Sequence, residues 1–277
     1  MNHRPVSPVH FLERALLFTF MAHGTAMVTM ALLLLPGMPG GGTDSDAARV
    51  AYIAGHPWIW RIGWLPWQLT ALSNLQLALA LLFTSWIPRL PAITVMISTM
   101  LAIYIEQPGE FRWVTEGVTL AQAAVTSGNI SDYLRFEMEI FPRIAGIAAI
   151  LYTLAASSWS RCFQDAGTWN RFLTWLSNVT WTLLLVMATG PLLPEGYRMS
   201  NAVVAVGNGV GFILLMLWLG LVTELVLRRS RPEACEPLLS WLPKRGGFLG
   251  NLLNELNQSR LAHVFLGWMF RGIRRKQ

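Results

Sequence analysis

The side chains that could carry chemistry lie mainly in two of the apolar segments of this sequence. His23 lies about midway along the first of them, with Thr19 one helical turn before it. A neutral imidazole at that place can ligate the metal of a haem or chlorophyll-type pigment, or relay a proton. The alternative is a histidine that is simply hydrogen-bonded across a helix bundle. A haem with two histidine ligands is disfavoured, because no second histidine lies midway along an apolar segment.

The second apolar segment is the most polar of the set and contains Arg61, Gln68 and Gln76. Arg61 and Gln68 are seven residues apart and share one face of a helix, and Gln76 lies near that face. As a functional site, this face lines a polar path or a cavity that opens outward. As a structural feature, Arg61 extends to the lipid headgroups and each glutamine bonds a neighbouring helix, worth about 0.6 kcal/mol. Arg61 can also pair with Glu106 or Glu110.

A glycine motif near residue 209 predicts a close contact between helices. Gly207 and Gly211 form a small-xxx-small face, and Asn208 can hydrogen-bond across it. Packing within the chain and packing against a partner helix both remain open.

Several catalytic signatures are absent from the sequence. It has no GxxxxGK[ST] phosphate loop, no HExxH pair and no GxSxG elbow, and its two cysteines do not form a CxxC motif. We therefore predict no metal site, and the sequence disfavours an enzyme without excluding one. Glu106 to Glu139 is expected to be an outer loop with a short surface helix near 114–125. This placement puts no acidic side chain at mid-membrane depth.

The composition indicates which elements must position these residues. Hydrophobic residues make up 53% of the chain and charged residues 13%, and the mean hydropathy is +0.44. Soluble domains usually carry about 25% charged residues. We therefore predict an all-α, polytopic transmembrane helix bundle. It comprises residues 1–231 and about six spans, which are long enough to cross a bilayer core of about 30 Å. The predicted spans are residues 11–36, 57–86, 92–105, 140–159, 172–193 and 201–227.

The distribution of basic residues predicts the orientation. Fifteen of the 21 Lys and Arg residues fall at the two termini and in the 86–91 and 160–171 connections. The positive-inside rule then places both termini in the cytoplasm of a bacterial-type inner membrane. Residues 232–277 are expected to form a basic, amphipathic, interfacial tail that ends in Arg271, Arg274, Arg275 and Lys276. These side chains are predicted to bind anionic lipid at about 1 kcal/mol each, so the net charge of +6 does not indicate nucleic acid.

Three functional hypotheses follow. The first is a non-catalytic accessory or assembly component that binds an apolar ligand, a pigment or a partner transmembrane helix. The second is a small permease or lipid-handling transporter that uses the Arg61, Gln68 and Gln76 face. The third is a membrane enzyme that acts on a lipophilic substrate with His23 as its acid–base or ligand group.

Overall fold

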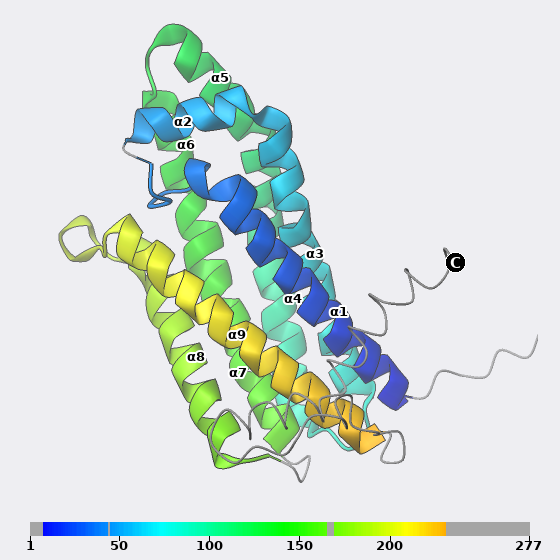
Figure 1. Ribbon diagram of the computed structural model, residues 1–277. Helices are drawn as coiled ribbons and strands as arrows, with labels where there is room; N and C mark the ends of the chain where they lie inside the picture. The colour runs from blue at the N-terminus through cyan, green and yellow to red at the C-terminus, as the bar shows by residue number, and fades with distance from the viewer. Residues whose placement is uncertain (1–7, 44, 165–168, 231–277) are drawn as a thin grey trace, which may run out of the picture.

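A computed structural model describes residues 8–43, 45–164 and 169–230 of the 277-residue chain, and all of its regular structure there is helical. This confirms the prediction of an all-α, polytopic bundle. Figure 1 shows the long helices side by side, with three shorter helices gathered beyond one end. The helices of the bundle are α1 (Pro8–Thr29), α3 (Pro57–Phe83), α4 (Arg89–Arg112), α7 (Ala149–Gln164), α8 (Arg171–Thr189) and α9 (Asn201–Ser230).

Among the described residues, five helical segments are long and apolar enough to cross a membrane. α3 corresponds to the remaining predicted span. It has 27 residues and packs between α1 and α4, but it is not one of these five segments. The number of spans and the orientation of the termini therefore stay predictions. The five segments are Phe11–Gly37, Arg89–Ser127, Ser131–Gln164, Arg171–Leu192 and Asn201–Leu227.

The three shorter helices, α2 (Asp46–Gly55), α5 (Val118–Ser127) and α6 (Ser131–Phe141), form what we call the cap. α5 continues α4 through a short π-helical stretch, Trp113–Gly117, so that residues 89–127 form one helical segment of 39 residues. At 1.5 Å per residue this segment is about 58 Å long, well beyond a hydrocarbon core of about 30 Å. α6 likewise continues through Pro142–Ala148 into α7. The 89–127 segment is therefore longer than a single membrane crossing requires.

The prediction of an outer loop over Glu106 to Glu139 is wrong. That stretch is almost entirely helical, and only the turn near Gly128 breaks it, with φ +70° at this glycine. The predicted third span, residues 92–105, was too short, and the helix that contains the fourth span begins at Ser131. Charged residues misled the prediction, because in the structure they pair along and between helices. Arg112, for example, contacts both Glu116 and Glu139, at 2.8 and 2.9 Å.

A second helix of the cap was also missed. The stretch between the first two spans was expected to be a loop, but it contains α2. The Ser45 hydroxyl caps this helix by accepting a hydrogen bond from the Ala48 amide at 3.2 Å, and Asp46 lies in its first turn. Both features stabilise the start of a helix. Ser45 and Asp46 were therefore a sequence signal for the start of a helix.

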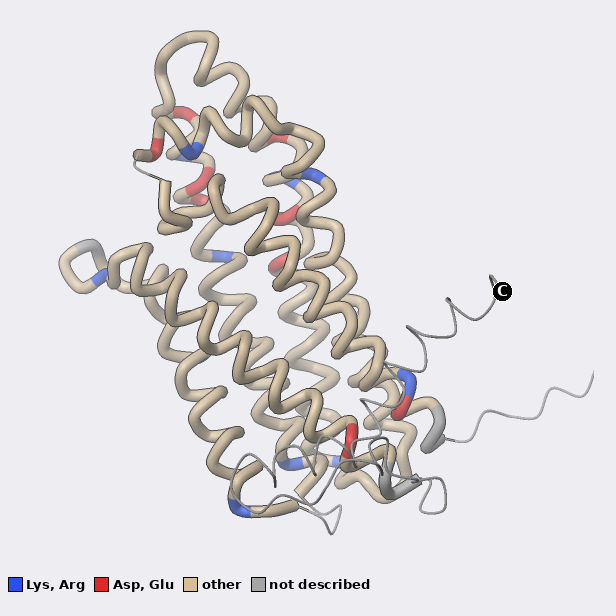
Figure 2. The backbone as a smooth tube through the Cα atoms, in the orientation of Figure 1, with Lys and Arg blue, Asp and Glu red and all other residues tan. Residues whose placement is uncertain are grey.

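Two separate hydrophobic cores result from this arrangement. The bundle core joins the long helices around Trp159, Trp181 and Trp218. The cap core joins α2, α5 and α6 to the adjacent ends of α3 and α4, around Trp60, Trp64 and Trp113. Figure 2 shows that most charged residues lie at the two ends of the long helices. The predicted lipid-binding residues Arg271, Arg274, Arg275 and Lys276, and the rest of the 232–277 tail, lie outside the described residues.

Candidate functional site

His23 is buried in α1, and its Nδ1 lies 2.9 Å from the carbonyl oxygen of Thr19, one turn earlier. Because a carbonyl only accepts, Nδ1 carries the proton and the lone pair is on Nε2. The Thr19 hydroxyl contacts two carbonyl oxygens, those of Ala15 at 2.9 Å and Ser73 at 3.2 Å. The hydrogen bond of His23 thus stays within its own helix. Among the described residues, no cluster of three metal-ligating side chains is present.

The predicted polar face of α3, with Arg61, Gln68 and Gln76, stays a prediction. Arg61 donates from Nε to the Val114 carbonyl at 3.1 Å, and its guanidinium lies 5.2 Å from the ring centre of Trp58. Within the described part of the chain it makes no ion pair with Glu106 or Glu110, contrary to the pairing considered from the sequence. Gln68 and Gln76 are half-buried. Arg61 therefore helps to fasten α3 to the cap.

The glycine face of α9 packs against this chain's own α8. A Cβ atom at Gly207 would lie 2.1 Å from Met187 Sδ, and one at Gly211 would lie 2.6 Å from Leu184. Asn208 is half-buried beside them. The close approach that the motif predicts is thus used within the chain on this side of α9.

The structure brings together a group that the sequence analysis did not assemble, on α4 and α7. Glu106 and Glu110 lie one turn apart on α4, and we call them the acid pair. Tyr152 of α7 donates from its hydroxyl to Glu106 Oε2 at 2.6 Å. The Gln107 amide nitrogen reaches both carboxyl groups, at 3.4 Å for Glu106 and 3.1 Å for Glu110. One NH₂ group therefore bridges the two acids.

The environment of the acid pair is unusual for carboxyl groups. Glu110 is only 1% exposed and Glu106 is half-buried. Neither makes an ion pair with any residue that the structure describes. Two carboxylates that share a poorly hydrated site repel each other, and this repulsion favours a state in which the pair keeps one proton. Acidic groups inside a membrane bundle are costly and usually mark ion or proton pathways. The acid pair is our candidate functional site.

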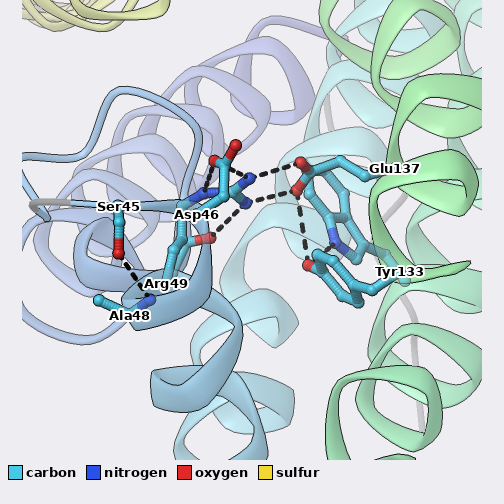
Figure 3. A network of polar contacts seen from close by, with 8 residues as sticks. Ser45, Asp46, Ala48, Arg49, Tyr133 and Glu137 are labelled. Carbon is cyan, nitrogen blue, oxygen red and sulfur yellow. Dashed lines mark hydrogen bonds and ion pairs between the residues drawn. The ribbon is translucent and has the colours of Figure 1, made fainter. Parts of the chain in front are cut away.

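A second charged group lies in the cap and is fully paired, as Figure 3 shows. Arg49 of α2 is 3% exposed and binds both carboxylate oxygens of Glu137 on α6, at 2.7 and 2.8 Å. It also contacts Asp46 at 2.8 Å and the Gly37 carbonyl at 3.3 Å. Burial by itself would lower the pKa of Arg49, but the hydrogen bonds and charge of Glu137, with Asp46, hold it above its usual value. This group is a latch between α2 and α6.

The latch continues into the aromatic core of the cap. The Tyr133 hydroxyl lies 3.5 Å from Glu137 Oε1 and accepts a hydrogen bond from Trp113 Nε1 at 3.2 Å. On its other side, Glu137 lines a cleft of about 160 Å³ together with Arg198 and Asn201. The Arg49–Glu137 pair thus connects two cap helices to the tryptophan core, and Glu137 also faces the cleft beside the start of α9. Its chemistry is that of a structural ion pair.

The acid pair was missed because its residues were assigned to a loop. The third span was ended at Ile105 because a polar stretch begins at Glu106, but α4 continues through Pro108 to Arg112. The four-residue spacing of Glu106 and Glu110 was the available sequence signal, since it places both acids on one face of a continued helix. The partner Tyr152 is 46 residues away, and local sequence patterns do not reveal such a contact.

Comparison of the chain with protein-family models, with curated proteins and with solved structures found no match.

Proposed function

We propose that this chain is a small proton-linked carrier in which the acid pair, Glu106 and Glu110, takes up and releases the transported proton. The observation that carries this proposal is a pair of carboxyl groups inside a helix bundle, bridged by one amide and without a cationic partner. It is a form of the permease hypothesis, with the polar path moved from α3 to α4 and α7.

The geometry fits proton exchange in three respects. A carboxyl pair can gain or lose one proton without the cost of burying two charges. Glu106 is half-buried and within reach of a donor, while Glu110 is enclosed. The Tyr152 hydroxyl donates to Glu106 at 2.6 Å and stabilises its ionised form. The pair therefore has two accessible protonation states within one fixed frame.

The other two hypotheses receive less support. The partner-helix version of the accessory hypothesis relied on the Gly207 and Gly211 face, which contacts Met187 and Leu184 of this chain. The enzyme hypothesis relied on His23, whose ring nitrogen bonds its own helix. As part of the proposal, we place the protein in a bacterial-type inner membrane with both termini in the cytoplasm. The excess of basic residues at the termini and in two connections supports that placement.

The test uses purified full-length protein in liposomes that contain a pH-sensitive dye, with a potassium diffusion potential driving proton entry. We expect the wild-type protein to carry protons into the liposomes. The rate of proton entry with the Glu106→Gln/Glu110→Gln variant should be at most about one tenth of the wild-type rate, because the variant lacks both exchangeable carboxyl groups. Glu116→Gln is the matched control, because Glu116 lies on the same helical segment but is exposed. The proposal fails if wild-type liposomes are no faster than empty ones, or if the double variant equals wild type.

A further inference from the structure

The two carboxyl groups of the acid pair have unequal hydrogen-bond donors. Glu106 Oε2 lies 2.6 Å from the Tyr152 hydroxyl and 3.4 Å from the Gln107 amide nitrogen, and both groups donate to it. Among the residues that the structure describes, Glu110 receives a hydrogen bond from Gln107 alone, at 3.1 Å. The shortest hydrogen bond at the site is therefore directed to one acid and not to the other.

The donation from Tyr152 favours the ionised form of Glu106. A phenol keeps its proton at neutral pH, so this hydroxyl has a hydrogen to donate. A hydrogen bond to a carboxylate is stronger than one to a neutral acid, and it therefore stabilises the charged form. Glu110 has no such donor among the described residues. Hydrogen bonding thus places the negative charge of the pair on Glu106.

Burial acts in the same direction. Glu110 is 1% exposed, whereas Glu106 is half-buried. Removing a carboxylate from water disfavours its charged form, and this cost is larger for the more enclosed group. The uncharged acid is therefore favoured at Glu110. Donor placement and burial are separate observations, and they assign the single proton of the pair to the same carboxyl group.

A glycine beside the acid pair lets α7 approach α4 closely enough for this contact. A Cβ atom at Gly109 would lie 3.0 Å from Ile144 Cγ1. Ile144 belongs to the π-helical stretch Pro142–Ala148, which continues into α7 and so into Tyr152. A side chain at position 109 would push the two helices apart. Gly109 therefore helps to bring the Tyr152 hydroxyl to Glu106.

We propose that Glu110 holds the proton of the acid pair, that Glu106 is its ionised member, and that Tyr152 is the positioning residue that sets this order. This inference rests on the proposed function. It also gives the contact between α4 and α7 a role, since withdrawal of Tyr152 removes a donor from Glu106 and lets the proton move there. The Glu110 O–H bond then breaks and a Glu106 O–H bond forms, so the charge of the pair does not change. The proton thereby reaches the less enclosed of the two acids.

The test compares infrared spectra of single variants of the full-length protein in lipid at neutral pH. Glutamine has nearly the shape of a protonated glutamic acid, so each substitution removes one titratable group with little change in packing. In Glu106→Gln the carbonyl band of the protonated acid should remain, because Glu110 is still enclosed without a cation. In Glu110→Gln the band should be lost, because Glu106 keeps its two donors and stays ionised.

A further substitution tests the positioning role of Tyr152. Tyr152→Phe keeps the ring and removes the hydroxyl. Made in the Glu110→Gln protein, it should restore the band, now from Glu106, because the ionised form has lost its closest donor. Tyr104→Phe is the matched control, since Tyr104 also lies in the bundle but is 78% exposed. In the same background it should not restore the band, and no restoration by Tyr152→Phe would contradict the role of its hydroxyl.

The outcomes separate this inference from the proposed function. A band that persists in Glu110→Gln and is lost in Glu106→Gln reverses the assignment. Equal bands in the two single variants, or a wild-type spectrum without the band, also overturn it. If wild-type liposomes take up protons in any of these cases, the assignment is wrong and the function stands. If they take up protons no faster than empty liposomes, the proposed function fails, whichever acid holds the proton. Should Glu106→Gln not purify as a folded protein, Glu110→Gln with and without Tyr152→Phe decides the assignment.

Discussion

The bundle core pairs the indole N–H groups of Trp181 and Trp218 with serine hydroxyls, whereas the cap core leaves those of Trp60 and Trp64 without an acceptor. In the bundle, each of these hydrogen bonds joins two different helices at 2.8 Å. In the cap, the tryptophan rings contact one another at centroid distances of 5.3 to 6.1 Å.

In the bundle core the rings of Trp159, Trp181 and Trp218 also contact one another, at 5.2 to 6.5 Å. Trp159 Nε1 has no acceptor among the described residues, whereas Trp113 of the cap donates to Tyr133. The two cores therefore differ in degree: two of three tryptophan N–H groups are paired in the bundle core and one of three in the cap core.

The difference indicates which contacts fix the packing of the helices in each region. In the bundle core, the hydrogen bonds of Trp181 and Trp218 each join two adjacent helices, and losing one leaves the other intact. The cap relies on ring packing, which is less directional, on the hydrogen bond from Trp113 to Tyr133, and on the latch between Arg49 and Glu137. A buried ion pair contributes little net stability, but breaking it is costly because one charge is left unpaired. We therefore expect the loss of Arg49 to cost the cap more stability than the loss of any one ring contact.

The largest expected effect is that of Arg49→Met. It leaves the buried Glu137 carboxylate without its partner, and we expect a loss of about 3–5 kcal/mol. The loss should be confined to the cap, so hydrogen exchange should rise in α2 and α6 while α8 and α9 stay protected. The double variant Arg49→Met/Glu137→Leu removes both charges and should recover most of the stability. Uniform loss of protection across the bundle would contradict the view of the cap as a separate unit.

A smaller effect is expected from one substitution made in each core. Trp218→Phe removes a hydrogen bond and leaves the Ser177 hydroxyl without its donor, at a cost of about 1–3 kcal/mol beyond the loss of ring area. Trp64→Phe removes an N–H group that has no acceptor, so only the ring area is lost. We expect the midpoint of thermal unfolding in detergent to fall further for Trp218→Phe. Equal shifts would show that hydrogen bonding does not distinguish the cores.

The helical architecture was predictable from hydropathy because long apolar runs report directly on helices that face lipid. The ends near Pro57 and Asn201 agree closely with the start of α3 and α9. Of the cap helices, only α5 was anticipated, by the short helix expected near 114–125; α2 and α6 were not predicted, since their polar residues resemble those of a loop. Charges such as Arg112 and Glu139 lie 27 residues apart and neutralise each other only once the helices fold together.

For the candidate site, the sequence indicated only the kind of residue to look for, an ionisable side chain inside the bundle. A search for ionisable groups inside the helix bundle was the correct approach, but it found His23 because α4 was ended too early. Once α4 extends through Pro108, Glu106 and Glu110 fall on one buried face. The contact with Tyr152 depends on how α4 and α7 pack, and nothing local in the sequence encodes it.

The most direct test of the central claim is infrared spectroscopy of the protein in lipid at neutral pH. If the acid pair keeps a proton, the spectrum contains the carbonyl band of a protonated carboxylic acid. That band should disappear in Glu106→Gln/Glu110→Gln and persist in Glu116→Gln. A wild-type spectrum without this band, or one that the double substitution leaves unchanged, would contradict the account.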